Sequence, residues 1–264
     1  MKIITCIKQV PASSDVKVDP VTGVLIRDSQ QVKMNPYDLY GLELSFKLKD
    51  EHENINVHAV SMGPPSAKQV LHEAIYMGAD QASLVTDRKF AGADVLATSY
   101  TLSQLVKTID AYDLIICGKQ TTDGDTAQVG PEMAEFLNIP HIPYVKEILN
   151  INEKSITVLS DYEDFEEVVT IDLPCLITVE KSALLNPRLP SYNRKRLYEN
   201  QKINELTLKQ LKDQNEAHYG LKGSPTQVEE IFPPQNEKHI ALLKGSANDV
   251  AKAMVQVLNE HKYI

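Results

Sequence analysis

Residues 117–131 read Cys-Gly-Lys-Gln-Thr-Thr-Asp-Gly-Asp-Thr-Ala-Gln-Val-Gly-Pro, and the rest of the chain is organised around them. An apolar run at residues 114–116 precedes this stretch, and a helical pattern at residues 132–137 follows it. A strand that leads through a Gly-, Asp- and hydroxyl-rich loop into a helix favours a bound phosphate. Glycine admits close backbone approach, and free N–H groups at a helix start attract negative charge. An ordinary strand-to-helix turn, with Asp or Thr capping the helix, is the alternative.

The residues before this stretch alternate between apolar strands and amphipathic helices. Strands are expected at residues 2–10, 56–62, 82–85 and 113–117, and helices at residues 37–50, 66–77 and 93–109. Ser66 is expected to cap the second helix and Gly78 to end it, and residues 16–27 read as a small hairpin. Four strand-then-helix units predict an α/β fold with a doubly wound, mostly parallel sheet of the Rossmann-like, adenine nucleotide-binding kind.

The loops that follow these strands are expected to meet at one place. Right-handed crossovers put such loops at one edge of a parallel sheet, and open α/β sheets bind ligands outside the carboxyl ends of their strands. The loops begin at Lys8 and Gln9, at residues 61–63 and at residues 118–130. They are therefore expected to line a single site.

The pattern changes after Pro140. Short strands at residues 145–151, 155–159, 168–171 and 175–179 predict an antiparallel or mixed extension of the sheet, in which the acidic run 161–167 is a solvated strand or turn. The Pro-broken run 184–190 excludes a regular element. A short helix is expected at residues 201–211, then an extended arm at 220–234 and a C-terminal amphipathic helix capped by Ser246. That helix needs its own core or a partner subunit to bury against.

Composition excludes several classes of protein. A net charge of −9, from 36 acidic and 27 basic residues, disfavours nucleic acid as a partner. No apolar run approaches the ~20 residues that span a bilayer. We therefore expect no membrane span, and we expect a cytoplasmic location. Cys6, Cys117 and Cys175 are widely spaced within apolar runs, and they read as buried thiols without disulfide or metal-ligand spacing.

Motifs for side-chain catalysis are absent from the sequence. It has no His-Glu-x-x-His, Gly-x-Ser-x-Gly, Walker or Gly-x-Gly-x-x-Gly pattern, and His58 lies within a strand, as a core histidine does. Asp123 and Asp125 can bind Mg²⁺, but two carboxylates in one loop are a weak signal. We therefore predict neither catalytic nor metal-binding residues, and interpret the chain as a nucleotide-binding module that leaves reactive chemistry to a cofactor.

Six motifs, taken in order, resemble the β subunit of electron transfer flavoproteins over essentially the whole chain. They are Lys-Gln-Val-Pro at residues 8–11, Asn-Pro-Tyr-Asp at 35–38, Val-Ser-Met-Gly-Pro at 60–64, Met-Gly-Ala-Asp at 77–80, the loop at 118–131 and Asn-Pro-Arg-Leu-Pro-Ser at 186–191. The resemblance implies a heterodimer with an α subunit that carries FAD. It also implies that the β subunit binds an adenine nucleotide, which is AMP in simple electron carriers and a second FAD in the electron-bifurcating branch.

The resemblance assigns the cofactor-binding residues by position. They are Cys6, Asn35, Pro36, Tyr37, Asp38, Met62, Gly118, Lys119, Gln120, Thr121, Thr122, Asp123, Gly124, Asp125, Thr126, Ala127, Gln128 and Val129. AMP-binding relatives typically carry an Asp-Asp-Asp-Cys-Asn-Gln-Thr-Gly loop. Here Gly124, Thr126 and Ala127 are small, which leaves room beyond AMP and favours FAD, with AMP as the alternative.

The bifurcating branch implies an electron path and partners. NADH would donate to the β-subunit FAD, one electron would pass to ferredoxin or flavodoxin, and the other through the α-subunit FAD to a flavin-dependent dehydrogenase, such as an acyl-CoA or 2-hydroxy acid dehydrogenase. In the family, a loop after the last strand docks the dehydrogenase through an aliphatic anchor. Tyr192 falls at the anchor position here, Leu189 is the nearest aliphatic residue, and Arg194 can flank an acidic partner.

These inferences divide the chain into three parts. Residues 1–183 form a nucleotide-binding α/β domain, residues 184–198 a partner-recognition loop, and residues 199–264 a C-terminal arm and helix that pack on the α subunit. From charge alone, the basic cluster at residues 194–196 reads as an ordinary solvated loop. A stand-alone adenine-nucleotide-binding module is the remaining alternative for the whole chain.

Overall fold

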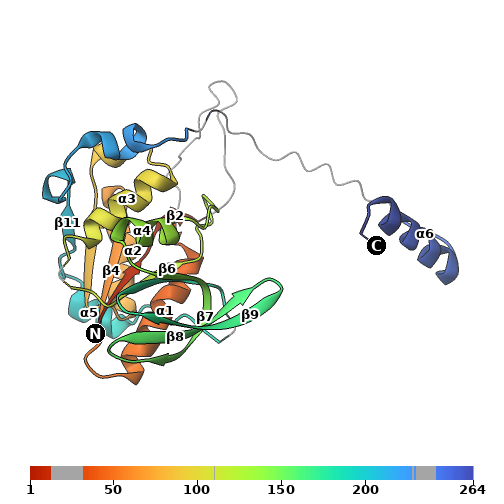
Figure 1. Cartoon of the computed structure of the whole chain (residues 1–264), viewed down its shortest axis with the longest axis horizontal. Helices are drawn as coiled ribbons and strands as arrows, with labels where there is room; N and C mark the ends of the chain where they lie inside the picture. The colour runs from red at the N-terminus through yellow and green to blue at the C-terminus, as the bar shows by residue number, and fades with distance from the viewer. Residues whose placement is uncertain (13–31, 110, 183, 228, 230–241, 264) are drawn as a thin grey trace. The chain divides into compact units, whose positions relative to one another are not determined.

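The computed structural model describes residues 1–12, 32–109, 111–182, 184–227, 229 and 242–263. The chain forms two compact units, Met1–Glu229 and Glu230–Ile264 (Figure 1). The hairpin expected at residues 16–27 lies outside the described residues. The division at residues 183 and 198 inferred from the sequence stays a prediction.

A large sheet forms the centre of the first unit. Its order among the described residues is β11-β5-β4-β1-β6-β10-β7-β8-β9. The strands are β1 (Lys2–Cys6), β4 (Asn56–Met62), β5 (Gln81–Val85), β6 (Leu114–Gly118), β7 (His141–Ile151), β8 (Ser155–Tyr162), β9 (Phe165–Asp172), β10 (Cys175–Val179) and β11 (Asn204–Leu206). All pairs from β11 to β7 are parallel, while β8 and β9 are antiparallel. A second, two-stranded antiparallel sheet pairs β2 (Gln9–Pro11) with β3 (Val32–Met34).

Helices cover both faces of the large sheet. Helices α1 (Pro36–Glu51) and α2 (Lys68–Met77) pack on one face, where Leu42 and Leu71 meet Ile3 in one core cluster. On the other face, α3 (Val95–Val106) and α4 (Val129–Leu137) bring Leu105 and Met133 against Ile4 (Figure 1). Successive residues of β1 serve opposite faces because side chains alternate along a strand. The doubly wound α/β fold expected from the sequence is confirmed.

The order of the strands places the functional crevice. From β1 the chain moves to β4 and β5 on one side, and then returns to β6 on the other side of β1. The loops after β1 and β6 therefore leave in opposite directions. This topological switch point opens a crevice at the carboxyl ends of these two strands, which is where open α/β sheets bind ligands.

Two helix ends test the predicted caps. Gly78 has φ +156° and its N–H reaches the Ala74 carbonyl at 3.0 Å, so the predicted C-cap of α2 is confirmed. The predicted Ser66 cap is wrong. Ser66 Oγ donates to Gln9 Oε1 at 2.9 Å, and Gln9 Nε2 donates to the Ser66 carbonyl at 3.0 Å. A partner distant in sequence competes successfully for the serine hydroxyl.

The second half of the first unit confirms one expectation and corrects two. Hairpins join β7, β8 and β9 into the expected antiparallel extension, and the acidic run forms the turn between β8 and β9. The helix expected at residues 201–211 is wrong, because β11 instead pairs with the edge strand β5. Residues 184–190 are irregular as expected, but α5 (Tyr192–Tyr198) follows, with Ser191 Oγ accepting from Arg194 N.

Short 3₁₀ helices complete the first unit. They are η1 (Pro65–Ala67), η2 (Arg88–Phe90), η3 (Leu208–Gln210), η4 (Glu216–His218) and η5 (Gly220–Gly223). The second unit carries α6 (Ala247–Glu260), capped by Ser246 as expected, with Met254, Val255 and Val257 exposed. None of the helices in the described ranges has the length and apolarity to cross a membrane.

Candidate functional site

Asp38 lies at the base of the crevice and joins three segments of the chain. Its carboxylate accepts hydrogen bonds from Lys8 N at 2.7 Å, from Asn35 Nδ2 at 2.9 Å and from Gly118 N. Burial raises the pKa of Asp38 to about 7, while these three donors and the nearby Lys8 charge oppose the rise. Because all three neighbours donate, the carboxylate ties the end of β1, the start of α1 and the end of β6 together.

Gly118 permits this close approach. A Cβ at this position would lie 2.8 Å from the Tyr37 carbonyl carbon and 2.9 Å from Asp38 N, and would also strike the Asp38 carboxylate. Real Cβ atoms do not approach backbone atoms so closely. The start of α1 can therefore abut the end of β6 only because residue 118 has no side chain.

Asn35 connects this base to the loop that follows β6. Its fully buried side chain donates from Nδ2 to the Gln120 carbonyl at 2.8 Å and accepts from Thr122 N at 3.3 Å. The Asn-Pro-Tyr-Asp motif thus has a physical reason. Pro36 starts α1, Asn35 and Asp38 fix the neighbouring strand ends, and Tyr37 OH lies 3.4 Å from Gln120 Nε2.

The tip of the loop differs from its base. Asp125 (φ 49°) and Ala127 (φ 54°) occupy the left-handed region, which residues with side chains seldom adopt. Gln120 Nε2 donates to Asp125 Oδ1 at 2.9 Å, and Lys8 Nζ forms an ion pair with Asp123 Oδ1 at 2.8 Å. Residues 122–126 are exposed. Gly124 has ordinary φ, and a Cβ there would approach the Thr121 hydroxyl at 3.2 Å.

Helix α4 begins where this loop ends. Gln128 precedes it and makes no side-chain hydrogen bond that caps the helix within the described structure. Pro131 has no N–H and Glu132 N donates to the Gln128 carbonyl at 3.0 Å, so Val129 and Gly130 supply the N–H groups that a phosphate could bind at this helix start. Gly130 brings the helix close to the sheet, because a Cβ there would overlap Thr178 of β10.

Two cysteines form the floor between the strands. The register that pairs Thr5 with Ile116 brings Cys6 beside Cys117, and both side chains are buried toward α3 and α4. A hydrogen bond with Cys6, together with burial, raises the pKa of Cys117 well above the usual thiol value. All three cysteines are buried and free, as expected. His58 is buried beside Ser83 Oγ at 2.9 Å, and burial lowers its pKa to about 4.

Most of the predicted cofactor-binding residues therefore lie together. Hydrogen bonds link the Asn-Pro-Tyr-Asp motif with the first half of the loop, and Val129 begins α4. Met62 ends the neighbouring strand β4, partly buried against the core on the α3 and α4 face. Within the described residues, no polar contact connects Met62 to the loop.

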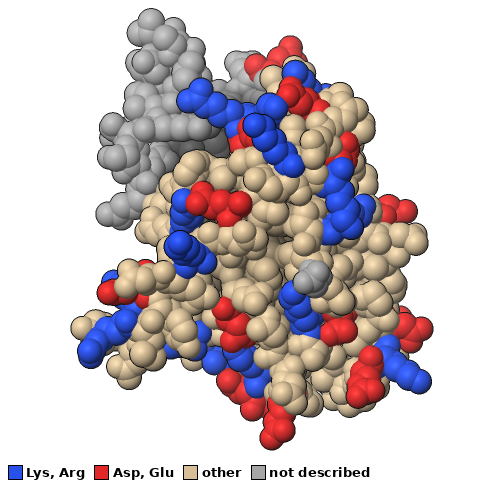
Figure 2. Space-filling view, turned by 90° about the vertical axis from the view of Figure 1, so that its left-hand side faces the viewer, with Lys and Arg blue, Asp and Glu red and all other residues tan. Residues whose placement is uncertain are grey.

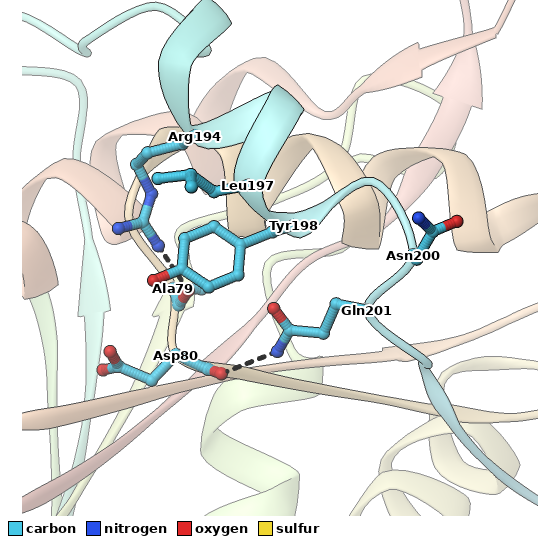
Figure 3. A pocket seen from close by; sticks show the side chains of 7 residues that line it. All are labelled: Ala79, Asp80, Arg194, Leu197, Tyr198, Asn200 and Gln201. Carbon is cyan, nitrogen blue, oxygen red and sulfur yellow. Dashed lines mark hydrogen bonds between the residues drawn. The ribbon is translucent and has the colours of Figure 1, made fainter.

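The predicted partner-binding residues lie elsewhere, around α5. Leu189 is 84% exposed and Tyr192 is 73% exposed. Arg194 instead points inward: Nε donates to the Ile75 carbonyl at 2.9 Å, a terminal N–H donates to the Ala79 carbonyl at 3.0 Å, and the guanidinium lies 4.8 Å from the Tyr198 ring centre (Figure 3). Arg194 therefore fixes α5 on the end of α2.

A pocket of about 380 Å³ opens beneath α5. It is lined by Ala79, Asp80, Arg194, Leu197, Tyr198, Asn200 and Gln201 (Figure 3). Leu197 is 76% exposed and adds a third apolar side chain to this surface. Over the face shown in Figure 2, basic and acidic side chains are interspersed, and neither sign gathers into a continuous patch among the described residues.

The sequence was then compared with known proteins. An electron transfer flavoprotein domain matches residues 22–203. The chain is 39% identical to the electron transfer flavoprotein subunit beta of Clostridium acetobutylicum over 100% of both chains. The chain belongs to the electron transfer flavoprotein family.

Two further relatives of this family have other names. The caffeyl-CoA reductase-Etf complex subunit CarD of Acetobacterium woodii is 40% identical over 100% of both chains. Protein FixA of Sinorhizobium fredii is 39% identical over 98% of this chain and 92% of its own length. The resemblance to β subunits inferred from the six motifs is therefore confirmed.

Sequence reasoning included Lys119 in the site but missed its two neighbours on one wall of the crevice, Glu180 and Tyr144. Lys119 Nζ forms an ion pair with Glu180 Oε2 at 2.6 Å and lies 4.7 Å from the Tyr144 ring centre. Tyr144 has φ 56°, and its N–H donates to Thr178 Oγ1 at 3.1 Å. Glu180 directly follows β10, so the rule that loops gather at carboxyl ends would have found it. Residues 175–179 were instead assigned to the antiparallel extension.

Proposed function

We propose that this chain is the β subunit of a heterodimeric electron transfer flavoprotein and binds FAD at the carboxyl ends of β1 and β6. The observation that carries the proposal is the meeting of Asn35, Asp38 and Gly118 with the loop at the switch point of the sheet. The start of α4, which no side chain caps in the described structure, fits a diphosphate, because N–H groups at a helix start attract negative charge. Family membership supports a flavin-associated role.

FAD is favoured over AMP by the small residues of the loop. Gly124 and Thr126 are exposed and Ala127 is half-buried, so none of them fills the space beside the start of α4. The name of the relative CarD, a subunit of a caffeyl-CoA reductase-Etf complex, supports the bifurcating branch. AMP in a non-bifurcating electron carrier is the alternative.

Bound FAD would supply the redox chemistry, accepting a hydride from NADH and releasing single electrons. The residues of this chain would bind and orient the FAD. Asp38 and Asn35 fix the loop, and the first turn of α4 holds the phosphates. No side chain is assigned the role of acid, base or nucleophile. In the proposal, ferredoxin or flavodoxin would accept one electron, and an acyl-CoA or 2-hydroxy acid dehydrogenase would accept the other by way of the α subunit and its FAD.

Exposed apolar surfaces support the proposed partners. Helix α6 exposes Met254, Val255 and Val257, and in the proposal it packs on the α subunit as part of the C-terminal arm. Leu189 and Tyr192 form the proposed docking surface for the dehydrogenase. Replacing both with Ala should impair transfer to the dehydrogenase and leave NADH-driven flavin reduction intact. An equal loss of flavin reduction would make this segment structural.

The cofactor content of the complex tests the proposal. The chain is co-expressed with its α subunit, and released flavin and AMP are quantified per heterodimer. Two FAD per heterodimer supports the proposal, whereas one FAD plus one AMP leaves the one-flavin electron carrier. A stable monomer that binds AMP or ATP without flavin, seen by size exclusion of the isolated chain, would instead establish a stand-alone nucleotide-binding module.

A further inference from the structure

The ion pair between Lys8 and Asp123 spans the mouth of the crevice. It joins Lys8, the second residue after the end of β1, to the tip of the loop after β6, with Nζ and Oδ1 2.8 Å apart. The backbone of Lys8 is fixed, since its N–H donates to Asp38 and its carbonyl accepts from Asn35 N at 2.9 Å. The side chain is 43% exposed and that of Asp123 is 33% exposed. The backbone of Lys8 is therefore fixed, while its ammonium group is free to change partner.

We propose that Lys8 binds the phosphate of a bound nucleotide. In the empty site Lys8 pairs with the Asp123 carboxylate, and the phosphate takes the place of this carboxylate when the nucleotide binds. This inference rests on the proposed nucleotide site. It adds a residue outside the positions assigned by resemblance, and it gives Asp123 a role opposite to that of a ligand-binding group.

The relative strength of the two contacts favours the exchange. An exposed Lys–carboxylate pair contributes little, because water screens it and both side chains lose freedom. A phosphate offers more negative charge and several acceptor oxygens, and its bonds with an ammonium are charge-assisted. Helix α4 starts close along the chain from Asp123, so a phosphate at its N–H groups would lie on the side of the crevice that Lys8 already reaches.

The negative charge of the loop gives a physical reason for Lys8 to pair with Asp123 before the phosphate binds. Asp123 and Asp125 carry two negative charges beside the site, and Asp125 is held by Gln120 Nε2 at 2.9 Å. Among the described residues, Asp123 has no polar side-chain partner other than Lys8. With Lys8 paired, one of these two negative charges is offset while the site is empty. Once Lys8 moves to a phosphate, the Asp123 carboxylate is released to solvent.

The two possible roles of the ion pair, stiffening the loop or competing with the phosphate, predict opposite effects of Asp123→Asn on nucleotide binding. If the ion pair only stiffened the loop, Lys8→Gln and Asp123→Asn would weaken nucleotide binding together. If Asp123 competes with the phosphate, Asp123→Asn strengthens binding while Lys8→Gln weakens it. The pair between Lys68 and Glu205 is a matched control, because its side chains are 38% and 44% exposed and its atoms are 2.8 Å apart.

The experiment is calorimetric titration of AMP into the complex with its α subunit, from which β-site nucleotide has been removed. We expect Lys8→Gln to weaken AMP binding about tenfold and Asp123→Asn to strengthen it about threefold. The double variant should match Lys8→Gln, Lys8→Arg should keep most of the affinity, and Lys68→Gln should change nothing. Thermal melting verifies that each variant folds.

Several results would overturn the exchange. They are parallel losses in Lys8→Gln and Asp123→Asn, an unchanged affinity in either variant, or a loss of the same size in Lys68→Gln. If the wild-type complex itself binds neither AMP nor FAD, the proposed function fails. Binding by the wild type with the wrong pattern in the variants defeats only the role of Lys8.

Discussion

The base and the rim of the crevice are built in contrasting ways. At the base, Asn35 and Asp38 are buried, and their side chains bind backbone groups of two other segments, one after β1 and one at the end of β6. At the rim, residues 122–126 are exposed, and an ion pair between half-exposed side chains joins the loop to β1. Buried polar groups are costly to leave unpaired, whereas exposed pairs contribute little. The base can therefore hold one geometry while the rim adjusts to a ligand.

This difference also separates stability from ligand choice. Substitutions at the base should act on folding first and on binding as a consequence. Substitutions at the rim should change which nucleotide binds and leave the free energy of unfolding nearly unchanged.

Asp38→Ala should have the largest effect. It leaves the N–H groups of Lys8 and Gly118 and the Asn35 amide without their acceptor. We expect a loss of about 3 kcal/mol in the free energy of unfolding, since each buried unsatisfied donor costs ~1–3 kcal/mol. Urea denaturation measures it. A loss below ~1 kcal/mol would mean that Asp38 does not hold the base together.

Gly118→Ala should come next, with a loss of about 2 kcal/mol, typical of forcing a methyl group into a packed site. The new Cβ would meet the backbone of Tyr37 and Asp38. Gly124→Ala is the matched control at the rim, where the new Cβ would meet only the Thr121 hydroxyl. Thermal melting should separate the two variants, and equal destabilisation would erase the distinction between base and rim.

The pH dependence of stability should report on the base. Burial raises the pKa of Asp38 from 3.8 to about 7 in the folded chain. The folded state thus holds a proton that the unfolded state loses, and the stability tied to this proton falls as pH rises from about 4 to about 7. Asp38→Asn removes the titration. Denaturation of both proteins at pH 4, 5.5 and 7 should show the wild type losing stability relative to the variant, and parallel curves would contradict this.

At the rim, Gly124→Asp should change ligand affinity with the smallest effect on folding. The added carboxylate crowds the loop and repels phosphate, so FAD binding should weaken by about tenfold, which corresponds to about 1.4 kcal/mol. The unfolding midpoint should stay within a degree or so, since exposed substitutions typically change stability by less than ~0.5 kcal/mol. Fluorescence titration of FAD measures the affinity. Unchanged FAD affinity would refute the argument that Gly124 makes room for the flavin.

Much of the site could be predicted because it depends on patterns of residues that are close in sequence. Alternating apolar strands and helices gave the doubly wound sheet, and the rule for carboxyl ends brought the loops at residues 8–9, 61–63 and 118–130 together. Cys6 and Asn35 were assigned to the site only by the family resemblance. Long-range choices were not predictable in this way. Ser66 bonds Gln9 instead of capping α2, and residues 204–206 become strand β11 because β5 offers an unpaired edge.

The missed wall has a similar cause. Lys119, Glu180 and Tyr144 meet because β10 inserts in parallel between β6 and β7, although β7 precedes it in the chain. If residues 145–179 are interpreted as consecutive hairpins, this insertion of β10 is not predicted. Arg194 shows the same limit on the surface, because the family resemblance placed it beside an acidic partner while its guanidinium binds the carbonyls of Ile75 and Ala79.

Amide hydrogen exchange of the complex with its α subunit, with and without bound nucleotide, tests the contrast between base and rim most directly. The N–H groups of Lys8, Asp38 and Gly118 should be protected in both states, since each is held by the base. Residues 123–126 and the first turn of α4 should exchange rapidly in the empty complex and become protected when nucleotide binds. Rapid exchange at the base, or protection by nucleotide that bypasses the loop after β6, would contradict the account.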